Sequence, residues 1–182
     1  MADIFIFTVG DTSARERFRL SMEAGHDLAD LFPFIDDEVQ RDKLQQLYPD
    51  NRCYLWGETE KNEGESEWER LSEGDLVLGY REGTIISVSY VLSKMNDPLL
   101  AQGLWSDCGG NTCGLLFFTT RPHICTTALV PQMFPYLDAE YYGFTRLGAE
   151  KLKNILAHYG SVDSFARLVF GQDFPFSLRH SL

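Results

Sequence analysis

Four short apolar segments follow one another closely in the middle of the chain, each bounded by turn-forming residues. They are Cys53–Trp56, Leu76–Tyr80, Thr84–Leu92 and Leu115–Thr120. Their length and their β-branched and aromatic residues predict strands, and Glu82-Gly83 predicts a hairpin turn. Strands in such tight succession, edged by short helical segments, predict an α+β fold. We expect a small, strongly curved mixed sheet or open barrel flanked by short helices, without a regular β-α-β repeat.

The first 51 residues have a different character. Ile4–Val9 reads as a buried strand that ends at Gly10-Asp11. Helical spacing follows, first to about Gly25 and then over residues 27–48 with an interruption at Pro33. We therefore expect residues 1–51 to form a strand-helix extension that packs on a domain of residues 52–182.

The rest of the chain is predicted to be mixed. Asp97 is expected to cap a short helix that runs up to Trp105, because Asp is a favoured N-cap residue. Residues 128–137 are predicted to be helical around their prolines. Residues 144–147 are predicted to form a last short strand, and the spacing over 148–159 and 162–170 predicts two helices.

The net charge of −11 is distributed unevenly. Residues 1–74 hold 18 acidic and 8 basic side chains, a charge of −10, whereas residues 75–182 hold 9 and 8, a charge of −1. Contacts with phosphate need local Lys and Arg, so the excess acid argues against nucleic acid mainly in the first part. The second part can present a basic patch from Arg81, Lys94, Arg121, Arg146, Lys151 and Lys153.

Recognisable enzyme signatures are missing from the sequence. There is no phosphate-binding G-x-x-x-x-G-K-[ST], no G-x-S-x-G and no H-E-x-x-H. We therefore expect a binding protein that is not an enzyme and has no cofactor. The N-terminus carries no secretory signal and no apolar run is long enough for a membrane span, so a cytoplasmic location is expected.

The cysteines are expected to be free thiols, because nothing marks the chain as secreted. Zinc held by Cys108, Cys113, His123 and Cys125 is the alternative, but the C-x4-C and H-x-C spacing matches no common zinc site. We therefore predict no bound metal.

Aromatic residues are what remains as a candidate site. Trp56 and Trp105 each end an apolar segment, where a side chain can reach a cavity rim, whereas Trp68 is expected to be structural. Core packing is the alternative role for each of these rings. A π-face stacks on any nucleobase, and a protein that extrudes a base needs such walls to replace the stacking lost from the duplex.

Several motifs, in this order, resemble a known family. They are W-G-x4-N (56–62), W-x2-L-x2-G-D-x-V-L-x-Y (68–80), L-A-Q-G-L-W (100–105), L-L-F-F (115–118) and G-F-T-R-L (143–147). Together they resemble the EVE and YTH branch of the PUA-like superfamily. More specifically, they are similar to the N-terminal DNA-reading domains of McrB-type modification-dependent restriction systems. The resemblance covers roughly residues 52–169.

The resemblance implies a curved sheet with an aromatic pocket for a modified base that is flipped out of duplex DNA. Carried over residue by residue, it implies a pocket of Trp56, Asn62, Tyr80 and Trp105. In a reader of this kind, Asn62 or Asp107 would hydrogen-bond the edge of the base. The flanking phosphates would contact Arg81, Lys94, Arg121 and Arg146. A GTP-driven motor and a nuclease would act with such a domain from elsewhere.

Three functions follow from these observations. The first is a DNA-binding reader that recognises a modified base, which we expect to be methylated. Such a reader would be the specificity module of a modification-dependent restriction system. The second is a YTH-like reader of RNA, which shares the stacking pocket. The third is an interaction module without nucleic-acid binding, whose acidic residues 1–74 meet a basic partner. Both N6-methyladenine and 5-methylcytosine fit an aromatic slot.

Overall fold

The computed structural model describes residues 1–59, 63–106, 108 and 111–171. At residues 63–66 it describes the backbone only. The strands are β1 (Ile4–Thr8), β2 (His26–Asp27), β3 (Arg52–Glu58), β4 (Leu76–Arg81), β5 (Thr84–Asn96), β6 (Leu115–Thr119), β7 (His123–Ala128) and β8 (Phe144–Arg146). The α-helices are α1 (Thr12–Phe18), α2 (Leu28–Leu31), α3 (Glu38–Leu47), α4 (Glu63–Arg70), α5 (Pro98–Leu104), α6 (Ala149–Tyr159) and α7 (Val162–Phe170). A π-helical segment, Arg19–Ala24, continues α1, and Phe32–Phe34 and Pro131–Met133 form 3₁₀ turns.

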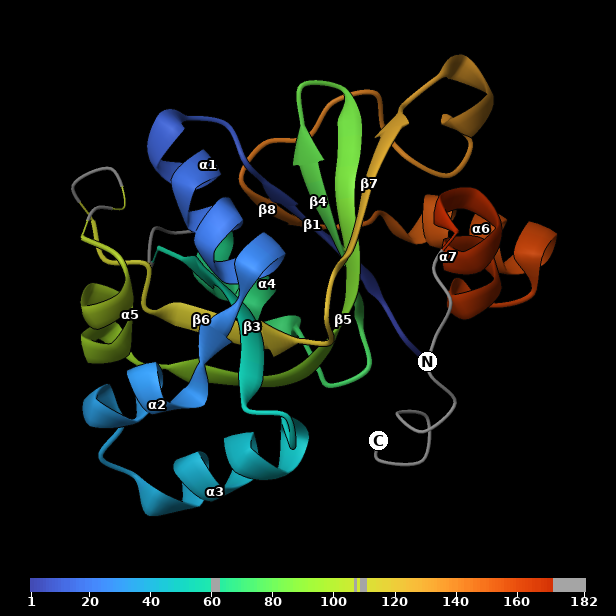
Figure 1. The fold of residues 1–182 in the computed structure, drawn as a ribbon. Coiled ribbons are helices and arrows are strands. Elements are labelled where there is room, and N and C mark those ends of the chain that lie inside the picture. Colours follow the sequence, from blue (N-terminus) through green and yellow to red (C-terminus); the bar gives the residue numbers. More distant parts are fainter. Residues whose placement is uncertain (60–62, 107, 109–110, 172–182) are drawn as a thin grey trace.

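The strands form one mixed sheet in the order β2-β3-β6-β5-β4-β1-β8, and β7 pairs with β5 outside this path (Figure 1). The pairing of β1 with β4 is parallel and all other pairings are antiparallel. β5 takes part in both halves of the sheet. Its first residues pair with β4 and β7, and Val91–Asn96 pairs with β6 across a register shift between Val91 and Ser93. Bulges of this kind bend strands, so β5 curves the sheet as predicted.

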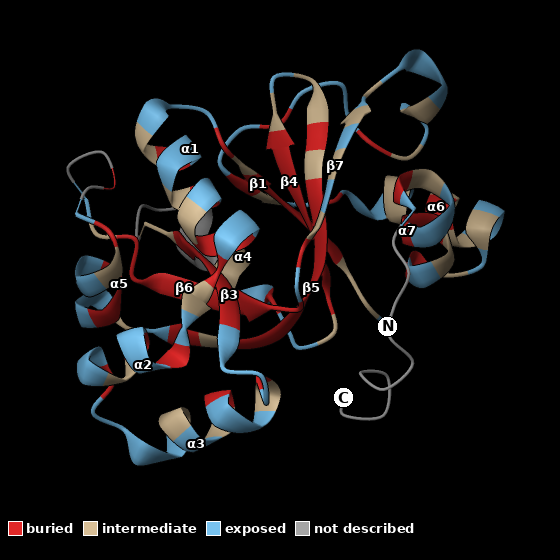
Figure 2. Ribbon diagram, viewed as in Figure 1, coloured by how far each residue is buried: buried red, intermediate tan, exposed pale blue. Residues whose placement is uncertain are grey.

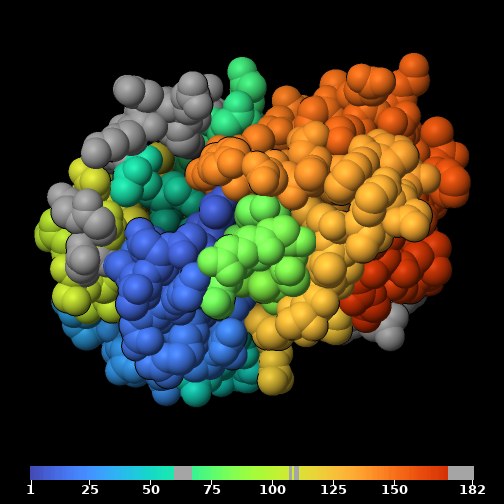
Figure 3. All heavy atoms as spheres, turned by 90° about the horizontal axis from the view of Figure 1, so that it is seen from above, coloured from blue at the N-terminus to red at the C-terminus, as the bar shows by residue number. Residues whose placement is uncertain are grey.

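The N-terminal segment is part of this sheet. β1 lies between β4 and β8, and Ile4–Thr8 pairs residue by residue with Leu76–Tyr80. Seen from above, the N-terminal residues lie beside the β4–β5 hairpin (Figure 3), where Arg15 and Glu82 form an ion pair of 3.1 Å. The boundary expected near residue 51 therefore does not separate two sheets, because residues before it supply an inner strand.

Most of the predicted elements are confirmed. The strands expected at 53–56, 76–80, 115–120 and 144–147 correspond to β3, β4, β6 and β8 within one or two residues at most boundaries. The Glu82-Gly83 turn has φ of 46° and 76°, the left-handed pair that a tight hairpin needs. Asp97 caps α5 by accepting a hydrogen bond from the Leu100 amide at 3.0 Å.

The helix predicted over residues 128–137 is wrong. The region contains the end of β7 and a single 3₁₀ turn, Pro131–Met133. Residues 123–128 alternate between half-buried and exposed, the pattern of a strand with one face on a core. The strand forms because its partner β5 is available, and that pairing is not local in sequence.

The core has three clusters on the two faces of the curved sheet (Figure 2). One lies under α2, α3 and α5, a second under α6 and α7, and a third between the sheet and α1. Tyr48, at the end of α3, donates its hydroxyl to the carbonyl oxygens of Tyr54 and Thr119 and so fastens the helix to β3 and β6. Within the described ranges, no helix combines the length and apolar composition that crossing a membrane requires.

The Gly-Asp of the G-D-x-V-L-x-Y motif has a structural role. The buried Asp75 carboxylate accepts the backbone N–H groups of Asp3 and Ser72, each at 2.8 Å. It thereby joins the start of β1 to the turn before β4. Gly74 has a φ of 91°, a conformation that favours glycine.

Asp75→Ala should lower the free energy of unfolding by about 2 kcal/mol, because it leaves the backbone N–H groups of Asp3 and Ser72 without their charged acceptor. The measurement is urea denaturation followed by circular dichroism. Asp36→Ala, which removes an exposed carboxylate, is the matched control and should change stability by less than about 0.5 kcal/mol. Equal stability of the two variants would contradict this role of Asp75.

Candidate functional site

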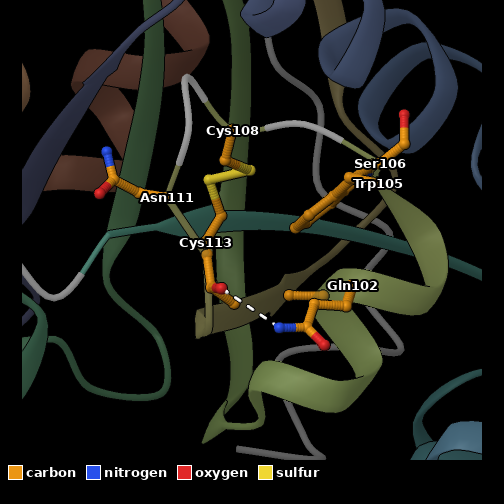
Figure 4. A pocket seen from close by; sticks show the side chains of 8 residues that line it. Gln102, Trp105, Ser106, Cys108, Asn111 and Cys113 are labelled. Carbon is orange, nitrogen blue, oxygen red and sulfur yellow. Dashed lines mark hydrogen bonds between the residues drawn. A yellow bond between two sulfur atoms is a disulfide. The ribbon is translucent and has the colours of Figure 1, made fainter.

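A pocket of about 390 Å³ opens between α5 and the loop that leads to β6 (Figure 4). Its volume is in the range of small-molecule binding sites. Its lining residues are Ala101, Gln102, Trp105, Ser106, Cys108, Asn111, Thr112 and Cys113. Their described side chains are aromatic, small or neutral polar, so the pocket suits a flat, uncharged ring that carries hydrogen-bonding edges.

Trp105 is the aromatic residue of the pocket lining; it is 5% exposed and is held from two directions. Its Nε1 donates a hydrogen bond of 2.9 Å to Ser21 Oγ, and Ser21 Oγ lies 2.8 Å from His26 Nε2. Ser21 is fully buried in the π-helical segment, so the N-terminal part of the chain orients this ring. On the other side, the indole packs over Gly57, where a Cβ atom would come within 2.7 Å of it.

Polar groups border the opening of the pocket. Gln102 and Asn111 are exposed, and each amide can both donate and accept hydrogen bonds. Gln102 Nε2 donates to Thr112 Oγ1 at 3.4 Å (Figure 4). These groups can therefore read the edge of a ring that enters beside Trp105.

The sequence did not single out Gln102, Asn111 or Thr112. Gln102 lies within L-A-Q-G-L-W, and Asn111 follows two glycines, but exposed amides are too common to stand out without knowledge of the pocket. Ser21, more than 80 residues from Trp105, had no signal in the sequence.

Trp56 lies on the other face of β3. Alternate side chains of a strand point to opposite faces, and it is Gly57, not Trp56, that faces Trp105. The Trp56 ring is 1% exposed and packs on two phenylalanine rings. Its centroid lies 4.9 Å from that of Phe7 and 6.4 Å from that of Phe18. The structure therefore does not bring Trp56 and Trp105 together as the two walls of one slot.

Tyr80 is also a packing residue. It contacts Tyr141 edge-on, with ring centroids 5.5 Å apart, and its hydroxyl accepts the Gly83 amide N–H at 3.0 Å. This hydrogen bond holds the β4–β5 hairpin. Asn62 and Asp107, the two polar residues expected at the pocket, lie outside the described residues.

Beside Trp56 lies the half-buried carboxyl group of Glu58. Trp56 Nε1 donates to Glu58 Oε1 at 2.9 Å, and the Arg17 guanidinium lies 5.2 Å from the centre of the Trp56 ring. Burial raises the pKa of the Glu58 carboxyl to about 7, although the Trp56 hydrogen bond and the Arg17 charge both act to lower it. Glu58 therefore changes its charge near neutral pH.

The four basic residues expected at phosphates lie on separate elements. Lys94 is engaged in structure, since its ammonium lies 4.7 Å from the Trp68 ring and donates to the carbonyl oxygens of Trp68 and Glu69. Arg146 forms a 2.8 Å ion pair with Asp3. Arg121 is exposed after β6, and Arg81 is half-buried at the hairpin.

Trp68 itself is structural, as predicted. Its Nε1 donates to the Leu116 carbonyl oxygen at 3.1 Å.

Two of the four cysteines are not free thiols, so that expectation is wrong for them. Cys108 and Cys113 form a disulfide, with Cα atoms 6.0 Å apart. The expectation rested on the cellular compartment alone, which does not predict how close two particular cysteines lie in the fold. Cys53 and Cys125 are free. No group of three or more His, Cys, Asp or Glu within the described ranges could hold a metal ion.

No family model matches this sequence, and no curated protein sequence is similar to it. Among solved structures, the N-terminal domain of Thermococcus gammatolerans McrB bound to m5C DNA is similar, with a TM-score of 0.62. The similarity covers 92% of this chain and 99% of that chain at 14% sequence identity. At such identity the similarity establishes the fold alone.

The chain therefore has a fold like that of the McrB N-terminal domain, a mixed α+β architecture with one open sheet. This confirms the resemblance and the fold class predicted from the sequence. A match over 92% of the chain also includes most of residues 1–51, which the sequence motifs did not reach.

Gly57→Ala should displace both the Cys113 backbone and the Trp105 ring, because the new methyl group would clash with the Cys113 carbonyl oxygen and lie 2.7 Å from the indole. We expect a loss of about 1–3 kcal/mol in the free energy of unfolding, measured by urea denaturation. Gly10→Ala is the matched control, since nothing lies within 4 Å of a Cβ atom there. Equal stability of the two variants would contradict the packing of Trp105 on Gly57.

Glu58 should make stability depend on pH. Its pKa is about 7 in the folded chain and close to the ordinary 4.5 when unfolded, so the folded state binds the extra proton between these values. The free energy of unfolding should therefore fall as pH rises from 4.5 to 7, by up to about 3 kcal/mol.

Denaturation curves at a series of pH values measure this effect. Glu58→Gln keeps an acceptor for Trp56 and should remove this part of the pH dependence. Glu150→Gln, at an exposed position of α6, should retain it. A Glu58→Gln variant with the same pH dependence as the natural chain would contradict the assignment.

Proposed function

We propose that this chain is a DNA-binding reader that recognises a modified, most simply methylated, base. The observation that carries the proposal is the fold similarity, over 92% of the chain, to a McrB N-terminal domain bound to m5C DNA. We further propose that the chain acts by binding and without catalysis, as the specificity module of a modification-dependent restriction system. A GTP-driven motor and a nuclease would then be its partners.

The base is proposed to enter the Trp105 pocket after flipping out of the duplex. Stacking on an aromatic ring contributes about 1–3 kcal/mol per base, which offsets part of the stacking lost from the helix. Gln102 and Asn111 border the opening and can hydrogen-bond the base edge, and Asp107 is proposed to assist them. Trp56 and Tyr80 support the sheet beneath the pocket in this proposal. Asn62 is retained as a predicted base contact.

The DNA backbone is proposed to contact Arg121 and Arg81, because Lys94 and Arg146 already bind other groups of the chain. Few phosphate contacts imply a shallow dependence of affinity on salt, since each contact adds about −0.9 to the slope of log K against log salt. We expect a slope no steeper than about −2, corresponding to the two contacts of Arg121 and Arg81.

Protein interaction without nucleic acid is the second candidate, and the surface of α3 favours it. Asp36, Asp37, Glu38 and Asp42 are exposed there, and they would suit a basic partner. Recognition of RNA would use the same stacking pocket with different backbone contacts.

The test is fluorescence anisotropy with labelled oligonucleotides at two salt concentrations. The panel contains duplex DNA with 5-methylcytosine, with N6-methyladenine and without modification, together with single-stranded DNA and RNA. We expect one modified duplex to bind at least about tenfold more tightly than the unmodified duplex. Preference for RNA would favour the YTH-like function, and absence of all binding at low salt would favour the protein-interaction module.

Gln102→Ala should weaken binding of the preferred modified duplex about five- to tenfold, because it removes one hydrogen bond of about 1 kcal/mol at the pocket opening. The side chain is exposed, so stability should not change. Gln46→Ala, an exposed amide on α3, is the matched control and should bind like the natural chain. Equal affinity of both variants would contradict the location of the base.

A further inference from the structure

The Cys108–Cys113 disulfide belongs to the wall of the Trp105 pocket. Both side chains line the pocket, with exposed fractions of 9% and 2%. Figure 4 shows the two sulfur atoms across the pocket from Gln102. Any change in this bond therefore acts directly on the shape of the cavity.

The two ends of the bonded loop are held differently. The Cys113 end is fixed to the sheet, because the Asp97 amide donates to the Gly114 carbonyl oxygen at 2.9 Å and the Cys113 carbonyl oxygen lies against Gly57. Cys108 has a local backbone bridge to Asn111. The disulfide thus adds a covalent cross-link between the Cys108 side chain and the end of the loop that is fixed to the sheet.

The bonded residues are only five positions apart. Opening so short a loop leaves the pairing of β3, β5 and β6 intact, since none of these strands depends on the bond. Its effect should therefore be confined to the pocket and should not extend to global unfolding.

The two other cysteines are poor candidates for the same chemistry, because the thiolate is the species that attacks a disulfide. Burial raises the pKa of the Cys53 thiol to about 12. Burial also raises the pKa of Cys125, whose Sγ donates to the Ile85 carbonyl oxygen at 3.4 Å. Cys53 and Cys125 are therefore disfavoured as attacking thiolates.

We propose that Cys108 and Cys113 form a reversible redox switch that sets the shape of the Trp105 pocket and, if the proposed function holds, its affinity for the modified base. A small disulfide such as oxidised glutathione supplies the oxidant. One cysteine thiolate attacks it, forms a mixed disulfide and releases one glutathione thiolate. The second cysteine thiolate then attacks the mixed disulfide, closes the protein bond and releases the second glutathione. The protein loses two electrons and two protons, and the oxidant becomes two glutathione molecules.

The first measurement needs no DNA. The whole chain is equilibrated in buffers with a series of ratios of reduced to oxidised glutathione. It is then unfolded in the presence of N-ethylmaleimide, and the number of labels is determined by mass spectrometry. We expect two labels under oxidising conditions, on Cys53 and Cys125, and four under reducing conditions, with a reversible transition between them. The same number of labels in every buffer would overturn the proposal.

The second measurement is hydrogen–deuterium exchange of the oxidised and reduced chain. Peptides that contain Trp105 and Cys113 should exchange faster after reduction, whereas peptides from β1 and β4 should not change. The double variant Cys108→Ser/Cys113→Ser should behave as the reduced chain in either buffer, and Cys125→Ser should behave as the natural chain. Exchange at the pocket that is independent of reduction would overturn the proposal.

The third measurement is binding of the preferred modified duplex in both states. We expect the reduced chain and the double variant to bind at least about tenfold more weakly than the oxidised chain, and Cys125→Ser to bind normally. Equal affinity in both states would overturn the control of binding. If the oxidised chain binds no modified duplex at all, the proposed function fails, while label number and exchange rate still decide whether the switch exists.

Discussion

The long strand β5 joins the two halves of the sheet. Thirteen residues, Thr84–Asn96, pair with β4 and β7 at one end and with β6 at the other. The strand can bend between these partners because small side chains occupy its crowded positions. Ser87 and Ser89 are fully buried, and Ser87 lies where a Cβ atom at Gly79 would clash. A larger residue at these positions would separate β4 from β5, and the two halves of the sheet would no longer share a strand.

The pocket is a consequence of that curvature and of two contacts that are distant in sequence. β3 pairs with β6, so Gly57 faces the side on which the chain returns after α5. Trp105 packs against Gly57, which has no side chain to displace the ring. Its indole N–H donates a hydrogen bond to Ser21 in the N-terminal segment. The same strand directs Trp56 into the cluster of Phe7 and Phe18. One strand therefore assigns one tryptophan to the core and positions the other at a cavity.

The local features of the fold could be predicted, and the pairing of distant segments could not. Glu82-Gly83 and the Asp97 cap depend on neighbouring residues, so turn and cap chemistry identified them. The strand β7 was missed because its identity depends on β5. The expectation that Trp56 and Trp105 share one pocket was based on their positions at the ends of apolar segments. The direction in which each ring points depends instead on strand register and on the space beside Gly57. The disulfide was missed because the expectation of free thiols followed from the cellular compartment, which does not reveal that the two Cα atoms lie 6.0 Å apart.

The chain contains three tryptophans, which makes one measurement especially direct. Each indole N–H gives a separate signal in an ¹H–¹⁵N correlation spectrum, and the natural chain can be titrated with modified and unmodified duplex DNA. A base that stacks in the pocket should shift the Trp105 signal with the modified duplex, while Trp56 and Trp68, which donate to Glu58 and Leu116, stay in place. Saturable binding of the modified duplex without a shift of the Trp105 signal would contradict recognition in this pocket.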